Sequence, residues 1–283
     1  MPELPTDLAN QVEAALREDL GGGDVTAALV PAAQRVRGSV MAREEAVLCG
    51  RAWADETFRQ LDQRVQLVWH AADGARVAAQ QLIFAIVGPA RPVLSGERTA
   101  LNFLQLLSGT ATATRRFVDA IAGTRCQILD TRKTIPGLRS AQKYAVRCGG
   151  AQNHRMGLYD QVLIKENHIA AAGSLTGAIE AARRNASGLS VEVEVETLGE
   201  LQEALNARPD IIMLVEFSLE DMRAAVALNR AHGAAAKLEV SGSVSLEAVR
   251  AIAETGVDYI SVGALTKHVR AIDLSMRLDF GGG

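Results

Sequence analysis

Cysteine is scarce in this chain of 283 residues, and its three cysteines form no Cys-x-x-Cys pair. Cys49, Cys126 and Cys148 are odd in number and give no disulfide framework. We interpret them as reduced, mostly buried thiols of a cytosolic protein. Their pattern excludes the class of small secreted domains that disulfides hold together.

Long apolar runs are also absent. No stretch approaches the roughly 20 apolar residues that a membrane-spanning helix needs. The N-terminal segment MPELPTDLANQVEAALREDL carries acids and lacks the basic start and apolar run of a signal peptide. We therefore expect a cytoplasmic protein with no membrane partner.

The chain also lacks an excess of positive charge. The chain has a net charge of -3, with 22% charged and 48% hydrophobic residues, which is ordinary for a soluble globular protein. The slightly acidic balance argues against nucleic acid as a partner. The length suffices for one large or two moderate domains.

What positive charge there is gathers between residues 130 and 168. This stretch holds seven Lys and Arg against three Asp and Glu, a net charge of +4. Helical spacing over 140–148 favours a solvated face for Lys143 and Arg147. The other cations lie beside strand ends or glycine turns, where they would bind a small anionic substrate. They are Arg132, Lys133, His154, Arg155 and Lys165.

The first part of the chain mixes helices with short strands. A helix beginning near Asp7 ends at the glycines 21–23, and no Gly-Lys-Ser/Thr follows to mark a phosphate loop. Strand-like runs occupy 36–42, 65–71 and 82–88. Helices at 47–60 and 95–121, the second capped by Ser95, would cover these strands.

After Gly123 strands and helices alternate. The strand candidates are 126–130, 161–165, 191–196, 211–216, 236–241 and 258–263. This rhythm is typical of repeated βα units that form a parallel sheet. Six strands are fewer than the eight of a standard barrel, so the pattern favours a reduced or partly open β/α barrel, with a doubly wound sheet as the alternative.

Side-chain alternation predicts which residues face the interior. In VEVEVE, Glu192, Glu194 and Glu196 share one face, and Glu239 and Ser241 share a face in AKLEVSG. If the valines pack against outer helices, the carboxylates point inward, where they need a partner charge or a charged ligand. An exposed edge strand with solvated glutamates is the alternative.

Two glycine-containing turns follow the last two strands. They are Ser241-Gly242-Ser243 and Val262-Gly263-Ala264, each before a helical pattern. The last two strand ends of a β/α barrel often bind a phosphate through backbone N–H groups. The pair of turns therefore predicts a phosphate site.

Several motifs in this order resemble those of the quinolinate phosphoribosyltransferase family, also called carboxylating nicotinate-nucleotide pyrophosphorylase. They are LDTRKTIPGLR at 129–139, GGAQNHRMGLYDQVLIKENH at 149–168, VEVEVE at 191–196, VGALTK at 262–267, SGERTALNFLQLLSG at 95–109 and the early EDLGGGDVT. The similarity covers nearly the whole chain.

This resemblance implies an N-terminal α/β sandwich domain over 1–110 and a β/α barrel with fewer than eight strands over 111–267. A closing segment, 268–283, would pack back on the first domain. The implied reaction joins quinolinate to phosphoribosyl pyrophosphate, releases pyrophosphate and CO2, and leaves nicotinate mononucleotide, a step of NAD biosynthesis. Mg²⁺ would accompany the pyrophosphate, and a homodimer or higher oligomer would share its active sites.

The resemblance also implies roles for single residues. The quinolinate pocket would be lined by Arg132, His154, Arg155 and Lys165, with Arg98 of the partner subunit. Lys133 would lie between the two substrates and Glu194 would hold ribose hydroxyls, so that Lys133, Lys165 and Glu194 are the catalytic candidates. The turns at 241–243 and 262–264 would hold the 5′-phosphate.

Two residues depart from the family pattern. Val215 stands where the family usually has an aspartate, and Ser243 replaces a usual glycine. They keep open a second interpretation, a same-fold relative such as the molybdenum-transport-associated proteins, which binds another anion or has lost catalysis. A binding module or structural oligomer is a third.

Overall fold

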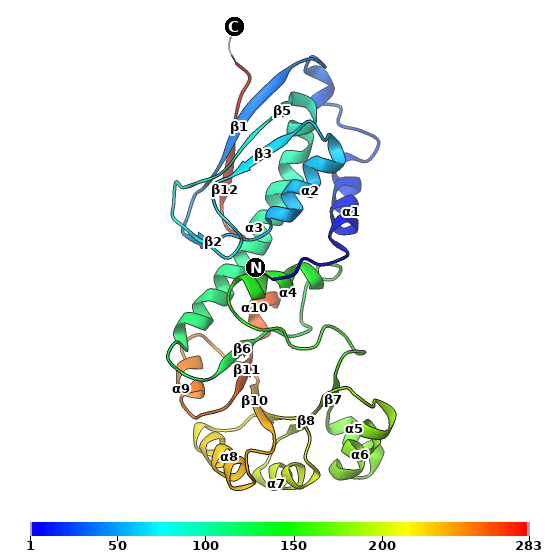
Figure 1. Cartoon of the computed structure of the whole chain (residues 1–283), viewed down its shortest axis with the longest axis vertical. Coiled ribbons are helices and arrows are strands. Elements are labelled where there is room, and N and C mark those ends of the chain that lie inside the picture. Colours follow the sequence, from blue (N-terminus) through cyan, green and yellow to red (C-terminus); the bar gives the residue numbers. More distant parts are fainter. Residues whose placement is uncertain (1, 282–283) are drawn as a thin grey trace. The chain divides into compact units, whose positions relative to one another are not determined.

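The structure is a computed structural model that describes residues 2–281 (Figure 1). Contacts within the chain divide it into two units. The first comprises the chain up to Arg115, the segment Thr134–Gly150 and the residues from Leu265, and the second comprises Arg116–Lys133 and Ala151–Ala264. Residues 282 and 283, the end of the expected closing segment, lie outside the described residues.

A four-stranded antiparallel sheet in the order β12-β1-β5-β3 forms the centre of the first unit. Its strands are β1 (Arg35–Ala42), β3 (Gln66–Trp69), β5 (Leu82–Pro89) and β12 (Leu274–Asp279), and a separate ribbon pairs β2 (Ala46–Val47) with β4 (Arg76–Val77). The three expected strands are confirmed. The closing segment provides β12, which runs antiparallel to β1.

Two helices, α2 (Arg51–Leu61) and α3 (Ala90–Ala120), pack on this sheet, and Phe58 and Leu104 share a core with Val40 and Phe84 of the strands. The other helical segments of the unit are α1 (Leu8–Leu20), a 3₁₀ turn (Ala27–Leu29), α4 (Arg139–Cys148) and α10 (Ala264–Lys267), the last of which begins at the end of the second unit.

The expected start of α3 is wrong. The helix begins at Ala90, directly after β5, so Ser95 lies inside it and is not its cap. Ser95 Oγ instead donates to Asp24 Oδ2 at 2.7 Å. A serine that bonds to a neighbouring segment cannot be told from a capping serine by sequence spacing, because both precede an apolar helical pattern.

The segment that carries α4 belongs to the first unit by its contacts, although it lies within the range 111–267 that the resemblance implies for the barrel domain. Tyr144 and Cys148 of α4 pack in one core with Trp53 and Leu107. Lys143 is only 1% exposed, so its expected place on a solvated face is wrong, while Arg147 is exposed. Helical spacing tells which residues share a face but not how many sides of the helix are covered.

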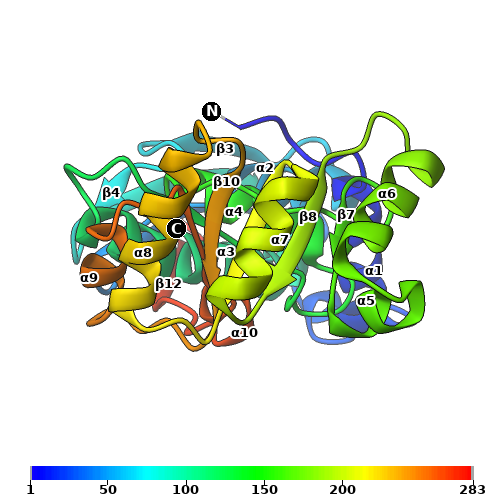
Figure 2. The ribbon, with the colours of Figure 1, turned by 90° about the horizontal axis from the view of Figure 1, so that it is seen from below.

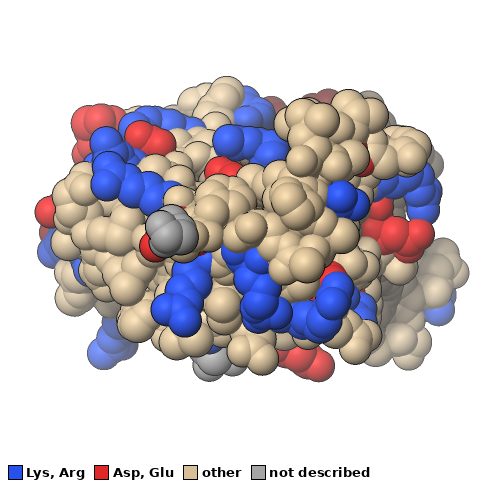
Figure 3. All heavy atoms as spheres, turned by 90° about the horizontal axis from the view of Figure 1, so that it is seen from above, with Lys and Arg blue, Asp and Glu red and all other residues tan. Residues whose placement is uncertain are grey.

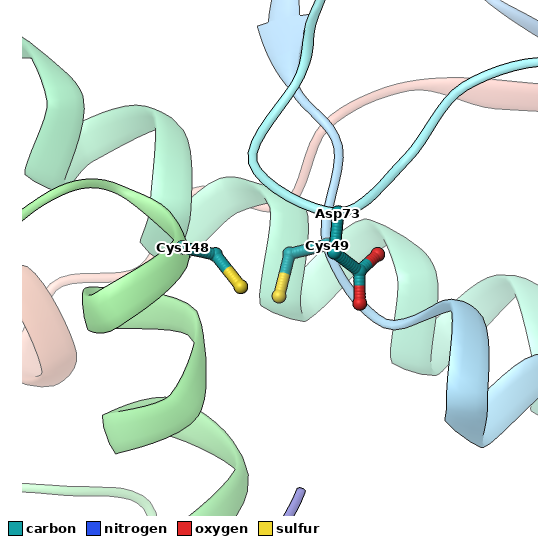
Figure 4. A group of neighbouring side chains, drawn as sticks. All are labelled: Cys49, Asp73 and Cys148. Carbon is teal, nitrogen blue, oxygen red and sulfur yellow. The ribbon is translucent and has the colours of Figure 1, made fainter. Parts of the chain in front are cut away.

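The two thiols of the first unit meet in its interior. Figure 4 shows Cys49 and Cys148 pointing toward each other, with Asp73 beside Cys49. Burial, and then the bond and charge of Cys148, raise the pKa of the Cys49 thiol, so it stays protonated at neutral pH. Asp73 accepts hydrogen bonds from Tyr144 Oη at 2.8 Å and from the Arg51 N–H at 3.2 Å. All three cysteines are free and buried, as the sequence predicts.

We expect Tyr144→Phe to lower the free energy of unfolding by about 1–3 kcal/mol, because the partly buried Asp73 carboxylate loses its hydroxyl donor. Burial already raises the pKa of Asp73, and the Tyr144 bond lowers it. The loss should therefore shrink at acid pH, where Asp73 is protonated in both proteins. Urea unfolding at neutral and acid pH measures it, with the exposed Tyr159→Phe as control. Equal losses of unfolding free energy in Tyr144→Phe and Tyr159→Phe would contradict the stabilising role of the Tyr144–Asp73 hydrogen bond.

Six parallel strands in the order β6-β11-β10-β9-β8-β7 form the second unit. They are β6 (Gln127–Leu129), β7 (Val162–Ile164), β8 (Val191–Val195), β9 (Ile211–Val215), β10 (Lys237–Ser241) and β11 (Tyr259–Ser261). All six strand candidates are thus confirmed. The sheet is the partly open β/α barrel that the strand count favours over a doubly wound sheet.

Helices follow the strands and cover their outer side. They are α5 (Glu166–Ala172), α6 (Leu175–Asn185), α7 (Leu198–Ala207), α8 (Leu219–Ala231) and α9 (Val249–Ala253). Figure 2 shows α7 and α8 alongside the strands β8 and β10. Side-chain caps begin three of them, through Ser174, Thr197 and Ser218. The valines of β8 are buried, which leaves Glu192 and Glu194 on the opposite face.

Charged side chains of both signs lie on the face that Figure 3 shows. On the face in Figure 3, Lys and Arg are scattered among uncharged residues, with Asp and Glu between some of them. Within residues 2–281, no helix has the length and apolar content that crossing a membrane requires.

Candidate active site

A cavity of about 230 Å³ in the second unit lies among the carboxyl ends of the barrel strands. Its lining is Thr131, Arg132, Lys133, His154, Arg155, Leu163, Lys165, Glu194, Met213, Ser241 and Ser261. The structure thus brings together the cations that the sequence singled out beside strand ends, with Glu194 and Ser241. We call this space the anion cavity.

Asp130 fixes two of the segments that line the anion cavity. It follows β6 directly and is fully buried. One of its oxygens accepts the Asn153 side-chain amide at 2.6 Å, and the other accepts the His154 N–H at 2.8 Å. Charge-assisted bonds of this kind are strong. The carboxylate therefore ties the loop with Arg132 to the turn that carries His154 and Arg155.

Arg155 and Arg132 place two guanidinium groups near each other. Burial lowers the pKa of Arg155, and the charge of Arg132 lowers it further, although Glu192, Asp160 and Glu194 oppose the shift. Guanidinium stays ionised, so the repulsion persists in the protein without substrate. An anion between them would relieve it, and a planar carboxylate suits this geometry.

Lys165 forms an ion pair with Glu194 across neighbouring strands. Its backbone N–H donates to His168 Nδ1 at 3.0 Å, at the start of α5. His168 therefore fixes the residue that carries the amine. Glu194 is the acidic side chain among the residues that line the anion cavity, beside Arg132, Lys133, Arg155 and Lys165.

The two glycine-containing turns contribute to the anion cavity in different ways. Ser241 lines the anion cavity at the end of β10, and Gly242 and Ser243 follow it, exposed. A Cβ at Gly263 would come within 3.0 Å of Lys133 Cδ, so the missing side chain leaves room for Lys133. The Val262 N–H donates to the Leu129 carbonyl at 2.9 Å, so it is already used within the sheet.

Val215 ends β9 on the face that Met213 presents to the anion cavity. It pairs in register with Ser241. Glu216 has a φ of 58°, and a Cβ added to Gly242 would lie 3.9 Å from Glu216 Oε1. Position 215 therefore faces the site side of the sheet, and the Glu216 carboxylate reaches the turn that follows β10.

Some predicted residues lie elsewhere. Arg98 is exposed on α3 in the first unit, and its action across a subunit interface stays a prediction. The cations of the 130–168 stretch that were not predicted as site residues, Arg139, Lys143 and Arg147, belong to the first unit too. Glu196 lies one residue beyond β8 and is exposed, so its expected inward position is wrong because the strand ends before it.

Sequence reasoning counted Asp130 only as a charge and missed its structural role. The signal available was an aspartate directly after an apolar strand and before Thr131-Arg132, at the end of the strand where such folds place their sites. Nothing in the spacing indicated that its partners would be Asn153 and the His154 N–H, which lie 23 and 24 residues later.

The partly open barrel and its cation-lined cavity define a class of β/α barrel proteins that bind small anions at the carboxyl ends of their strands. The chain belongs to the quinolinate phosphoribosyl transferase family. The family's N-terminal domain matches residues 24–108, and its C-terminal domain matches residues 110–277.

Relatives with nearly the same length support this membership. The nicotinate-nucleotide pyrophosphorylase [carboxylating] of Mycobacterium leprae is 44% identical over 94% of this chain and 95% of its own. The probable enzyme of that name in Bacillus subtilis is 43% identical over 92% and 89%. The solved nicotinate-nucleotide pyrophosphorylase of Francisella tularensis is 47% identical, with a TM-score of 0.94 over 98% of both chains.

Proposed function

We propose that this protein transfers phosphoribosyl from phosphoribosyl pyrophosphate to quinolinate, and releases pyrophosphate and CO2 to give nicotinate mononucleotide, a step of NAD biosynthesis. The observation that carries the proposal is the pair Arg132 and Arg155, set side by side with Lys133 and Lys165 around one cavity. Quinolinate has two adjacent carboxylates, which two guanidinium groups can bind through paired hydrogen bonds. The names of the close relatives support the same reaction.

The cavity offers a distinct partner to each charged part of the two substrates. Arg132 and Arg155, with His154, would hold the ring carboxylates. Lys133 would lie toward the pyrophosphate and stabilise its charge as it departs, while Gly263 leaves room for this side chain. Ser241, with the turns at 241–243 and 262–264, would bind the 5′-phosphate.

Glu194 is suited to the ribose. When pyrophosphate leaves, positive charge develops at the anomeric carbon, and a nearby carboxylate stabilises it. Glu194 is partly exposed to the anion cavity, with a side-chain exposure of 20%, and is paired with Lys165. Binding of quinolinate would draw Lys165 toward a ring carboxylate and free Glu194 for the ribose hydroxyls.

Decarboxylation needs less from the protein. Once the ring nitrogen carries ribose it is cationic and can hold the electron pair left when the adjacent carboxylate departs as CO2. Lys165 beside that carboxylate would act as an electrostatic partner or as the source of the proton that replaces it. Arg132 and Arg155 would keep the ring in place through this step.

Magnesium enters this proposal only with the substrate. The acidic side chain that lines the anion cavity is Glu194, which is already paired with Lys165. This donor set fits a cation that is carried by the pyrophosphate oxygens, and we assign no side chain as its ligand. When bound there, Mg²⁺ neutralises charge on the leaving group.

The remaining expectations belong to the same proposal. The protein would act in the cytoplasm as a homodimer or higher oligomer in which Arg98 of the partner subunit completes each quinolinate pocket. No feature of residues 2–281 or of the relatives favours a same-fold protein that binds another anion without catalysis.

Incubation with quinolinate, phosphoribosyl pyrophosphate and Mg²⁺ tests the function. We expect nicotinate mononucleotide by mass spectrometry, with one CO2 and one pyrophosphate released for each molecule formed. Lys133→Ala is the matched loss-of-function control. Failure of the purified, folded protein to form this product would overturn the proposal.

Val215→Asp should lower KM for phosphoribosyl pyrophosphate by roughly ten- to a hundredfold and leave KM for quinolinate little changed. A carboxylate at this position would meet ribose hydroxyls or a magnesium-bound water, and one charge-assisted hydrogen bond contributes about 1.5–3 kcal/mol. Val215→Asn is the uncharged control. An unchanged KM would mean that the Glu216 carboxylate near Gly242 already serves in its place.

A further inference from the structure

Three side chains meet in the barrel interior next to the anion cavity. His154 Nε2 lies 3.1 Å from Glu192 Oε2 of β8 and 3.6 Å from Glu239 Oε1 of β10. Both glutamates are fully buried. We call these residues the interior triad. His154 lines the anion cavity and also a second cavity of about 260 Å³, which Glu239 lines among the amino-terminal ends of the strands.

The charges facing Glu239 are few and mostly of one sign. Glu192 faces it from β8 and His154 from the loop before β7, and Ser261 and Tyr259 of β11 supply hydroxyl groups nearby. Its neighbour on β9 is Met213, which does not titrate. Glu192 Oε2 accepts the Gln161 side-chain amide at 2.8 Å, whereas neither Glu239 oxygen has a well-formed hydrogen bond, although the Ser261 hydroxyl lies near enough to lower the pKa of Glu239. Two buried carboxylates with oxygens within 4.8 Å of each other cannot both stay ionised without compensation.

The imidazole does not supply a full positive charge. The backbone N–H of Arg155 donates to His154 Nδ1 at 2.7 Å, so Nδ1 of the imidazole carries no proton. The ring proton is therefore on Nε2, where it faces the Glu192 carboxylate, and the imidazole is neutral. A metal ion on Nε2 would have to displace that proton and leave an imidazolate, so the hydrogen bonds oppose a metal site here.

A proton between the glutamates resolves the imbalance. Burial first, and then the charge of Glu192, raise the pKa of Glu239 to about 8, although His154 and the Ser261 hydroxyl act to lower it. With Glu239 protonated, its hydroxyl can donate to Glu192, whose Oε2 lies 3.1 Å from His154 Nε2, and His154 Nδ1 accepts the backbone N–H of Arg155. This chain of contacts leads from the buried interior to the backbone of a residue that lines the anion cavity.

We propose that Glu239 is a positioning residue that holds a proton against Glu192, so that the interior triad fixes His154 and Arg155 for binding of an anionic substrate. The inference rests on the proposed function for the identity of that substrate. Loss of this proton would add a second buried negative charge beside the anion cavity and would weaken binding of the quinolinate dianion.

The pH dependence of kinetics tests the positioning role. For the unmodified protein we expect kcat/KM for quinolinate to fall above pH 8 by roughly tenfold per pH unit, mainly through a rise in KM. E239Q mimics the protonated acid, so its profile should stay flat over the same range. E220Q, an exposed glutamate of α8, should keep the fall. An alkaline fall in E239Q equal to that of the unmodified protein would overturn the proposal.

Infrared spectroscopy tests the proton without any turnover. We expect a carbonyl band of a buried protonated carboxyl at pH 7 that disappears by pH 9.5 and is absent from E239Q. A folded, active protein without the band would overturn this inference and leave the proposed function unaffected. A band in a folded protein that does not convert quinolinate would overturn the proposed function and leave the proton on Glu239 supported. If E239Q does not fold, the titration of the unmodified protein still decides.

Discussion

Arg155→Ala should reduce kcat/KM for quinolinate by at least ~2 kcal/mol, or about thirtyfold, because it leaves one substrate carboxylate without its charged partner. Arg132→Ala should lose a similar amount, since the two guanidinium groups lie near each other beside one cavity. The loss should appear mainly with quinolinate as the varied substrate. Steady-state kinetics with saturating phosphoribosyl pyrophosphate measures it.

Arg147→Ala is the matched control for these variants. Arg147 comes from the same cation-rich stretch but is exposed on α4 in the first unit. We expect its kcat/KM to stay within about twofold of the unmodified value, as is usual for a surface substitution. Equal losses in Arg147→Ala and Arg155→Ala would show that general charge, and not the anion cavity, determines binding.

A mixture of Arg98→Ala and Lys165→Ala protein should regain activity that neither variant has alone. If Arg98 acts in the site of the partner subunit, each hybrid dimer contains one site with both residues intact. Random exchange in a dimer would then restore about a quarter of the sites. The physical reason is that a cation from another subunit would complete the proposed pocket, while Lys165 lines the anion cavity of its own chain.

A chain that carries both substitutions provides the control for this mixture. Mixed with either single variant, it should restore nothing, because no hybrid site would then hold both side chains. Subunit exchange is checked separately by mass spectrometry of tagged chains. Exchange without recovery of activity would show that Arg98 does not act in trans.

Much of the second unit could be predicted because its local patterns and its tertiary structure agree. The alternation in VEVEVE placed Glu192 and Glu194 opposite the buried valines, and the six strand candidates became six parallel strands. Cations beside strand ends came together because parallel strands present their carboxyl ends at one edge. The two-residue alternation of side chains along a strand, together with short apolar runs, is enough to predict the strands and the faces of their residues.

The rest depended on contacts between segments far apart in the sequence. Lys143 has helical spacing that suits a solvated face, yet it is buried, because packing covers more of α4 than its apolar residues indicate. The ties from Asp130 to the turn at 153–154 join residues whose pairing no local pattern encodes. The proton expected on Glu239 follows from the distances to Glu192 and His154, which only the fold sets.

Two guanidinium groups in one cavity would select a dicarboxylate over a monocarboxylate. Product formation from quinolinate and from nicotinate, measured side by side with the same phosphoribosyl pyrophosphate and Mg²⁺, tests this selection. We predict a kcat/KM for quinolinate at least about thirtyfold above that for nicotinate, which has one carboxylate and leaves one guanidinium unpaired. Equal turnover of the two pyridines would contradict it.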